Sequence, residues 1–210
     1  MLKKMLFLLG IFFCVYPYVN KWTAKAQYDE LSYYEEVVDC LGENQAEEIM
    51  EKARAYNCTA IAAPRDYQQL LNPAGNGMMC SIRIPKLNLS LPVYHGTEEE
   101  TLEKGIGHLY GSSLPVGGSG SHSLLAGHRG LPGAKLFTEL DKLELGDAFE
   151  IHVCGSVLSY LVCNISVIEP KDTKILAKQQ GRDLVSLITC TPYGINTHRL
   201  VVTGEREEGI

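Results

Sequence analysis

The chain has 210 residues, 45% of them hydrophobic, and a formal net charge of −6 at pH 7. A chain of this length can bury one good hydrophobic core, and we do not expect two. Its 25 acidic residues outnumber 19 Lys and Arg, and the basic residues form no stripe along the sequence, which argues against a nucleic-acid partner.

The N-terminal segment is apolar enough to interact with a membrane. Lys3 and Lys4 precede an apolar run from Met5 to Val19, and a helix over this run spans about 22 Å of the roughly 30 Å hydrocarbon core. Two interpretations are open: a retained signal anchor, or a signal peptide removed after Ala26, the end of an A-x-A-like site. We favour the retained anchor.

The next stretch predicts helices. Between Gln27 and Tyr56 the sequence is dense in Glu, Gln, Ala and Leu and has a possible break at Gly42, which favours two amphipathic helices. They form either a stalk or a cover packed on the core, and the two are compatible. A turn-rich cluster from Asn72 to Gly77 marks the boundary of the following domain.

From Met78 onward the sequence predicts β-structure. Turn signals separate seven short runs of apolar and β-branched residues, over 81–84, 87–94, 121–125, 148–153, 157–168, 184–189 and 199–203. This pattern indicates a closed or nearly closed barrel that is rich in antiparallel pairs. The apolar positions change parity across Pro85, which predicts a bulge or bend there.

The last two runs bring a thiol and a guanidinium close together. Cys190 ends one run and Arg199 begins the next, across a connection rich in Pro, Gly and Asn. In an antiparallel hairpin these residues lie one or two strand spacings of about 4.8 Å apart. A thiolate is a nucleophile, and a permanently charged fork of N–H donors suits a developing oxyanion. The alternatives are a core thiol and a structural ion pair.

His128 is the candidate proton partner for Cys190. A free cysteine with a pKa near 8.5 is only about 3% thiolate at pH 7, so a nucleophilic thiol needs a group that shares its proton. His128 ends an apolar run between Gly127 and Gly130, and these glycines permit a sharp turn that leaves the imidazole at a strand end. The other five histidines lack this combination.

Three linked motifs resemble those of the sortases, which are cysteine transpeptidases of Gram-positive surfaces. The motifs run from Gly107 to Gly118, from Ala126 to Gly130, and from Thr189 to Gly194 with Asn196 to Arg199. The resemblance covers about residues 70–206 and is greatest to the class C enzymes, which polymerise pilins.

The resemblance implies a mainly β fold, a closed eight-stranded sortase-type barrel with short helices. The domains are then expected over 1–26 (signal anchor and juxtamembrane segment), 27–72 (helical stalk and a shortened connection in the lid region) and 73–210 (catalytic barrel). It also implies a cell-membrane location, with a single N-terminal anchor and an extracytoplasmic catalytic domain.

A transpeptidase mechanism follows from the same resemblance. Cys190 attacks the Thr–Gly carbonyl of an LPXTG-like signal, His128 protonates the leaving amine and Arg199 stabilises the oxyanion. The expected partners are LPXTG-type surface or pilin proteins and an amine that opens the thioester. That amine is a pilin lysine in a pilin polymerase, or a peptidoglycan-precursor amine in a wall-anchoring enzyme. Net hydrolysis by water and a non-catalytic barrel that binds sorting signals are further alternatives.

Two short segments are expected to contact the substrate, on the resemblance alone: Ser112, Ser113, Leu114, Pro170, Asp172 and Thr173. For the second segment the alternative has equal weight. It is an ordinary helix N-terminus, capped by Asp172 or Thr173, before a predicted helix over 174–180.

We expect no metal or other cofactor, because no closely spaced Cys and His residues show zinc-ligand spacing. The seven cysteines are expected to be mostly free, buried thiols. Class C sortases carry a lid with an Asp-Pro-aromatic motif. The corresponding connection, residues 57–66, lacks that motif, so we expect a Cys190 that is not covered by a lid.

Overall fold

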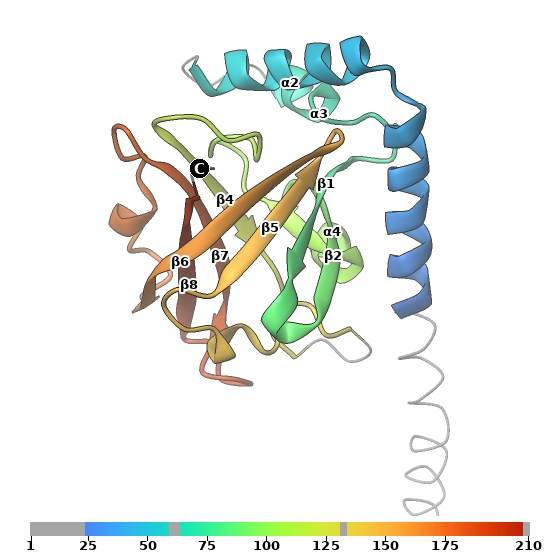
Figure 1. Cartoon of the computed structure of the whole chain (residues 1–210). Coiled ribbons are helices and arrows are strands. Elements are labelled where there is room, and N and C mark those ends of the chain that lie inside the picture. Colours follow the sequence, from blue (N-terminus) through green and yellow to red (C-terminus); the bar gives the residue numbers. More distant parts are fainter. Residues whose placement is uncertain (1–23, 59–63, 131–133, 208–210) are drawn as a thin grey trace, which may run out of the picture.

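A computed structural model describes residues 24–58, 64–130 and 134–207 (Figure 1). The expected membrane anchor falls almost wholly outside these residues, as do residues 59–63 of the expected lid-region connection. Within the described ranges, no helix is both long and apolar enough to cross a membrane.

The described chain folds around one closed barrel of eight strands. The strands are β1 (Met78–Ile84), β2 (Leu89–His95), β3 (Ile106–His108), β4 (Ser121–Ala126), β5 (Ala148–Val153), β6 (Ser156–Ile168), β7 (Asp183–Thr191) and β8 (His198–Arg206). They close in the order β1-β2-β3-β4-β7-β8-β6-β5. The expected eight-stranded barrel is confirmed.

The barrel contains one strand that the sequence did not predict. β3, with only three residues, is too short to show a periodic pattern and was not predicted. It pairs in parallel with β2, and β4 pairs in parallel with β7, so the barrel is antiparallel-rich but mixed. The bend predicted at Pro85 is confirmed as a short 3₁₀ turn, η1 (Pro85–Leu87).

The barrel interior is built by alternate residues of each strand. On β7, Val185 and Leu187 belong to the hydrophobic core, and Leu200 and Val202 do so on β8. Because successive strand residues point to opposite faces, residues of the other parity, such as Cys190 and Arg199, face outward from the barrel. This alternation decides where the candidate site lies.

Two longer helices lie before α3 (Pro64–Gln69) and the barrel, within the stretch where the sequence indicates helices. One covers residues 24–40 and the other is α2 (Glu43–Cys58), with the break at residues 41–42. Figure 1 shows the first beside the barrel and α2 across one end. Met50 and Ala53 of α2 join the barrel core, and Tyr34 of the first helix donates a 2.9 Å hydrogen bond to the Met79 carbonyl. These helices therefore pack on the barrel.

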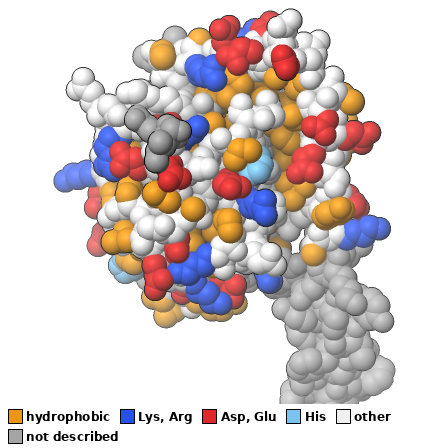
Figure 2. All heavy atoms as spheres, viewed as in Figure 1, with side chains coloured by type: hydrophobic (Ala, Val, Ile, Leu, Met, Phe, Trp, Pro, Cys, Tyr) orange, Lys and Arg blue, Asp and Glu red, His pale blue; other side chains and the backbone are white. Residues whose placement is uncertain are grey.

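The outer surface carries charges of both signs. In Figure 2 acidic and basic side chains are interspersed over the visible face, and acidic ones gather over α2 at the top of the view. α2 carries Glu43, Glu47, Glu48 and Glu51. Its polar face is thus solvated, whereas its apolar face is buried.

The remaining helical elements are short. They are α3 (Pro64–Gln69), α4 (Glu99–Lys104), η2 (Leu140–Lys142) and η3 (Lys174–Leu176). The helix predicted over 174–180 is therefore limited to one 3₁₀ turn, because the backbone becomes extended at Ala177. All six described cysteines are free, but only Cys80 and Cys154 are buried.

Candidate active site

Cys190 and Arg199 face each other across two antiparallel strands. They are Cα partners in the β7–β8 ladder, which places their Cα atoms about 4.5–5.5 Å apart and their side chains on the same face. The hairpin geometry predicted from sequence is therefore present. Cys190 is partly exposed, so its thiol lies at the surface and not in the core.

The β4–β7 ladder leads toward both His128 and Cys190. The parallel register pairs Ser121 with Asp183 and continues to Ala126 with Ile188, a constant offset of 62 residues. The same offset, extended two residues, relates His128 to Cys190. Two hydrogen bonds continue the ladder past the strand end: Gly127 N donates to Ile188 O at 3.0 Å and Thr189 Oγ1 donates to Gly127 O at 2.7 Å.

The two glycines around His128 have different roles. Gly130 has a φ of +83°, which confirms the sharp turn predicted there. Gly127 is needed for close approach, because a Cβ at that position would lie 2.6 Å from Ile106 Cδ1 and 2.8 Å from Phe137 Cδ2. The His128 backbone is thus packed against the barrel wall at one side and turns away at the other.

The His128 imidazole lies beside a carboxylate. Its Nε2 is 3.3 Å from Glu99 Oε1 at the start of α4, but the contact lacks hydrogen-bond geometry, since Nε2 is buried without a hydrogen-bond partner among the described residues. The Glu99 side chain is 73% exposed, so solvent screens this pair and its contribution is small.

The Arg199 guanidinium is held at the hairpin end. Nη1 donates to Asn196 O at 3.2 Å and to His198 O at 3.1 Å, and the planar group carries further N–H donors on Nε and Nη2. His198 pairs with Thr191 and points to the opposite face. Arg199 is therefore the residue of this pair that shares a face with Cys190.

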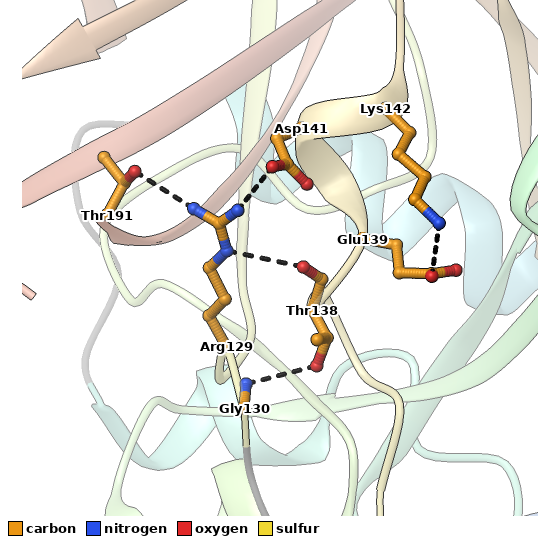
Figure 3. Close-up of polar contacts among 7 residues, drawn as sticks. All are labelled: Arg129, Gly130, Thr138, Glu139, Asp141, Lys142 and Thr191. Carbon is orange, nitrogen blue, oxygen red and sulfur yellow. Dashed lines mark hydrogen bonds and ion pairs between the residues drawn. The ribbon is translucent and has the colours of Figure 1, made fainter. Parts of the chain in front are cut away.

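The loop after His128 is tied to the strand that carries Cys190 (Figure 3). Arg129 Nη1 donates to Thr191 Oγ1 at 3.0 Å, Nη2 donates to Asp141 Oδ2 at 2.6 Å, and Nε donates to Thr138 O at 3.3 Å. Sequence reasoning did not assign a role to Arg129. The only signal was its place in the His128 motif.

The first expected substrate segment is largely buried. Ser113 and Leu114 are each 1% exposed, and the Asn57 side chain bonds both the N–H and the carbonyl of Leu114, at 2.6 and 3.0 Å. Ser112 Oγ lies 3.1 Å from His108 Nε2 and donates to Leu109 O. This loop is held by contacts with α2 and β3, and Ser112 is its partly accessible member.

The second expected substrate segment is exposed. Pro170, Asp172 and Thr173 lie at the surface between β6 and β7. Asp172 Oδ1 accepts a 3.3 Å hydrogen bond from Lys174 N at the start of η3, whereas Thr173 makes no side-chain cap bond. The capping interpretation thus applies to Asp172.

Two buried histidines support the walls of the site. His108 is fully buried between Tyr67 Oη, 2.8 Å from its Nδ1, and Ser113 O, 2.8 Å from its Nε2. Burial lowers the pKa of His108 to about 4. His122, whose pKa is also lowered by burial, lies with its Nε2 2.7 Å from Ser186 Oγ on the outer face of β4 and β7. Both are neutral structural groups near pH 7.

A comparison with known proteins agrees with this geometry. The family model described as Sortase domain matches residues 82–207, which include His128, Cys190 and Arg199. The chain belongs to the sortase family. Sortases are cysteine transpeptidases, and the described barrel is the sortase fold.

Solved sortases and a curated relative are similar over most of the barrel. Sortase C1 from Streptococcus agalactiae is 40% identical with a TM-score of 0.81, covering 89% of this chain and 100% of that one. Streptococcus pneumoniae sortase C is 38% identical with a TM-score of 0.78, covering 86% and 97%. Sortase D of Bacillus subtilis (strain 168) is 30% identical over 128 residues, 60% of this chain and 62% of the relative. The chain thus matches about three fifths of that curated relative's length.

Proposed function

We propose that this sortase cleaves an LPXTG-like sorting signal through a thioacyl intermediate on Cys190 and transfers the acyl group to an amine. The observation that carries the proposal is the pairing of Cys190 with Arg199 on the outer face of the barrel. It is supported by the β4–β7 ladder, whose constant offset of 62 residues, continued two residues past Ala126 and Ile188, relates His128 to Cys190.

Each side chain has one role in the proposed reaction. The Cys190 thiolate attacks the Thr carbonyl carbon, and the negative charge that develops on the carbonyl oxygen accepts hydrogen bonds from Arg199. His128 donates a proton to the departing Gly nitrogen, and the thioester forms. The incoming amine then attacks the thioester, His128 takes its proton, and Cys190 leaves as thiolate.

Pilin polymerisation is the preferred outcome. The class C sortases among the solved relatives support it, and the Streptococcus pneumoniae structure is described as giving insight into pilin substrate specificity. The acceptor is then a pilin lysine, and the product is an isopeptide bond. Wall anchoring with a peptidoglycan-precursor amine is the second candidate. A non-catalytic signal-binding barrel is disfavoured, because Cys190 and Arg199 are paired on one face and His128 stands at the position that the β4–β7 offset relates to Cys190.

The exposed segment at Pro170, Asp172 and Thr173 is proposed to line the signal groove, with Ser112 at its opposite wall. We also propose that the N-terminal segment holds the enzyme at the outer face of the cell membrane. Fractionation of expressing cells tests this: intact N-terminal peptide in the membrane fraction supports it, and a mature protein that begins at Gln27 contradicts it.

Acceptor competition tests the function. The enzyme is incubated with a labelled LPXTG-like peptide and either a lysine-bearing pilin domain or a peptidoglycan-precursor amine, and products are identified by mass spectrometry. Pilin polymerisation predicts an isopeptide on the pilin lysine, with a Lys→Arg pilin as the matched control. Exclusive transfer to the precursor amine supports wall anchoring. Binding without any cleaved peptide contradicts both enzymatic proposals.

A further inference from the structure

The Arg129 side chain joins three separate segments of the chain near the candidate site. Its three guanidinium nitrogens bond Thr191, Asp141 and Thr138, each on a different segment of the chain: β7, η2 and the loop before η2. The side chain is only 8% exposed. A guanidinium this buried is stable only while its bonds are made, so its contacts are specific.

The Arg129–Thr191 bond repeats the register of the candidate catalytic pair. Arg129 follows His128, Thr191 follows Cys190, and both pairs are 62 residues apart, the offset of the β4–β7 ladder. Since successive strand residues face opposite sides, this bond lies on the side of the sheet opposite the reacting groups. The bond therefore ties the segment that carries His128 to β7 and leaves the outer face of the sheet, where Cys190 lies, free for substrate.

The segment that carries His128 and Arg129 is also bonded to Phe137 and Thr138, next to the hydrophobic core. Phe137 is fully buried, and its N–H donates to His128 O at 3.2 Å. Thr138 accepts from Arg129 Nε through its carbonyl and from Gly130 N through Oγ1, at 3.1 Å (Figure 3). The loop that carries His128 is thus fixed to the barrel wall through Phe137 and to β7 through Arg129.

We propose that Arg129 is a positioning residue that sets the distance and orientation of His128 relative to Cys190 through its bond to Thr191. This inference rests on the proposed function, because it requires His128 and Cys190 to exchange a proton. Arg129 itself does not touch the reacting atoms. Displacement of a reacting group by about 1 Å can cost about 100-fold in rate, so a bond that fixes this distance affects turnover more than binding.

Thr191→Val is the preferred variant. Removing Arg129 would leave Asp141 and Thr138 without their partner and could prevent folding, whereas valine keeps the shape of threonine and removes only the hydroxyl acceptor. Thr191→Ser keeps the hydroxyl and is the rescue variant. Thr197→Val, in the exposed connection of the same hairpin, is the matched control for a hydroxyl lost elsewhere.

Two readouts separate positioning from stability. The first is kcat and KM for cleavage of an LPXTG-like peptide. The second is the rate at which iodoacetamide alkylates Cys190 at different pH values, followed by peptide-resolved mass spectrometry, with His128→Ala as reference. If Thr191 only stabilises the fold, Thr191→Val lowers the melting temperature but does not change the pH profile of Cys190 alkylation.

For Thr191→Val we expect kcat to fall about tenfold with KM within about twofold of wild type. Its alkylation profile should move toward that of His128→Ala, while Thr191→Ser and Thr197→Val stay near wild type. An unchanged kcat and profile in Thr191→Val, or an equal loss in Thr191→Ser, overturns the positioning role. If His128→Ala cleaves peptide like wild type, the proposed function itself fails, and the inference with it.

Discussion

Cys190 on β7 is the Cα partner of Arg199 on β8, in a ladder whose register is unbroken from Leu184 opposite Glu205 to Cys190 opposite Arg199. A shift of one residue would turn the guanidinium to the other face and bring His198 opposite the thiol. The buried residues Leu187 and Val202 are partners in the same ladder and oppose such a shift, because a slip of β8 would turn its core residues Leu200 and Val202 to the outer face.

The first prediction concerns Arg199. Lysine keeps the charge but cannot reproduce a planar fork that reaches the oxyanion from the hairpin end, so Arg199→Lys should lose about 10²- to 10³-fold in kcat. Peptide-cleavage kinetics measure this, with Arg83→Lys on the exposed face of β1 as the matched control. Activity of Arg199→Lys within about threefold of wild type would show that Arg199 is structural.

The second prediction concerns Gly127. A methyl group there would lie 2.6 Å from Ile106 and 2.8 Å from Phe137, so Gly127→Ala must displace core side chains or the His128 loop. We expect a loss of about 1–3 kcal/mol in the free energy of unfolding, together with reduced turnover. Gly42→Ala, whose added Cβ has no atom within 4 Å, is the control in chemical denaturation. Equal stability of Gly127→Ala and wild type would contradict the packing argument.

The third prediction is a loss of stability in mild acid. In the unfolded chain His108 binds a proton near pH 6.5, but burial lowers its pKa to about 4 in the fold. Acidification between these values therefore favours the unfolded state, and we expect His108 alone to cost about 2 kcal/mol between pH 7 and pH 5. Burial lowers the pKa of His95 and His122 too, with an effect of the same sign.

Urea unfolding followed by circular dichroism at pH 5, 6 and 7 measures this effect. His108→Gln is expected to be less stable at pH 7 but to depend less on pH than wild type. His152→Gln, on the exterior of β5, is the control for the loss of an imidazole outside the core. The account of His108 is wrong if His108→Gln loses as much stability as wild type between pH 7 and pH 5.

Most of the barrel and the candidate triad could be predicted from the sequence, because strand alternation and turn residues are local signals. Seven strands and the Cys190–Arg199 hairpin show such signals. β3 does not, since its three residues are placed by pairing with Val93 to His95 of β2. The Arg129–Thr191 bond joins residues 62 positions apart, and only the β4–β7 register brings them together.

The burial of Ser113 and Leu114 also depends on tertiary contacts. Asn57 at the end of α2 holds the Leu114 backbone, and Tyr67 of α3 holds His108 beneath the same loop. No local pattern in the loop itself indicates these partners. The resemblance placed the loop near the site, but could not say which of its side chains remain accessible.

The fourth prediction concerns access to Cys190. Because residues 57–66 lack the lid motif and Cys190 is partly exposed, a bulky charged thiol reagent should modify Cys190 in the resting enzyme. Exposed Cys163 is an internal positive control. Cys80 and Cys154 are negative controls, since both are buried and burial raises the pKa of the Cys154 thiol to about 11. An unlabelled Cys190 beside a fully labelled Cys163 would indicate a covered site.

The central claim is that Cys190 carries the acyl group. Intact-protein and peptide-resolved mass spectrometry after incubation with an LPXTG-like peptide tests it most directly, with Cys163→Ala as a matched loss of a surface thiol. We expect a thioester on Cys190 in wild type and in Cys163→Ala, and no acyl adduct or cleaved peptide with Cys190→Ala. A covalent thioester on another cysteine of Cys190→Ala, with peptide cleavage retained, would contradict the assignment.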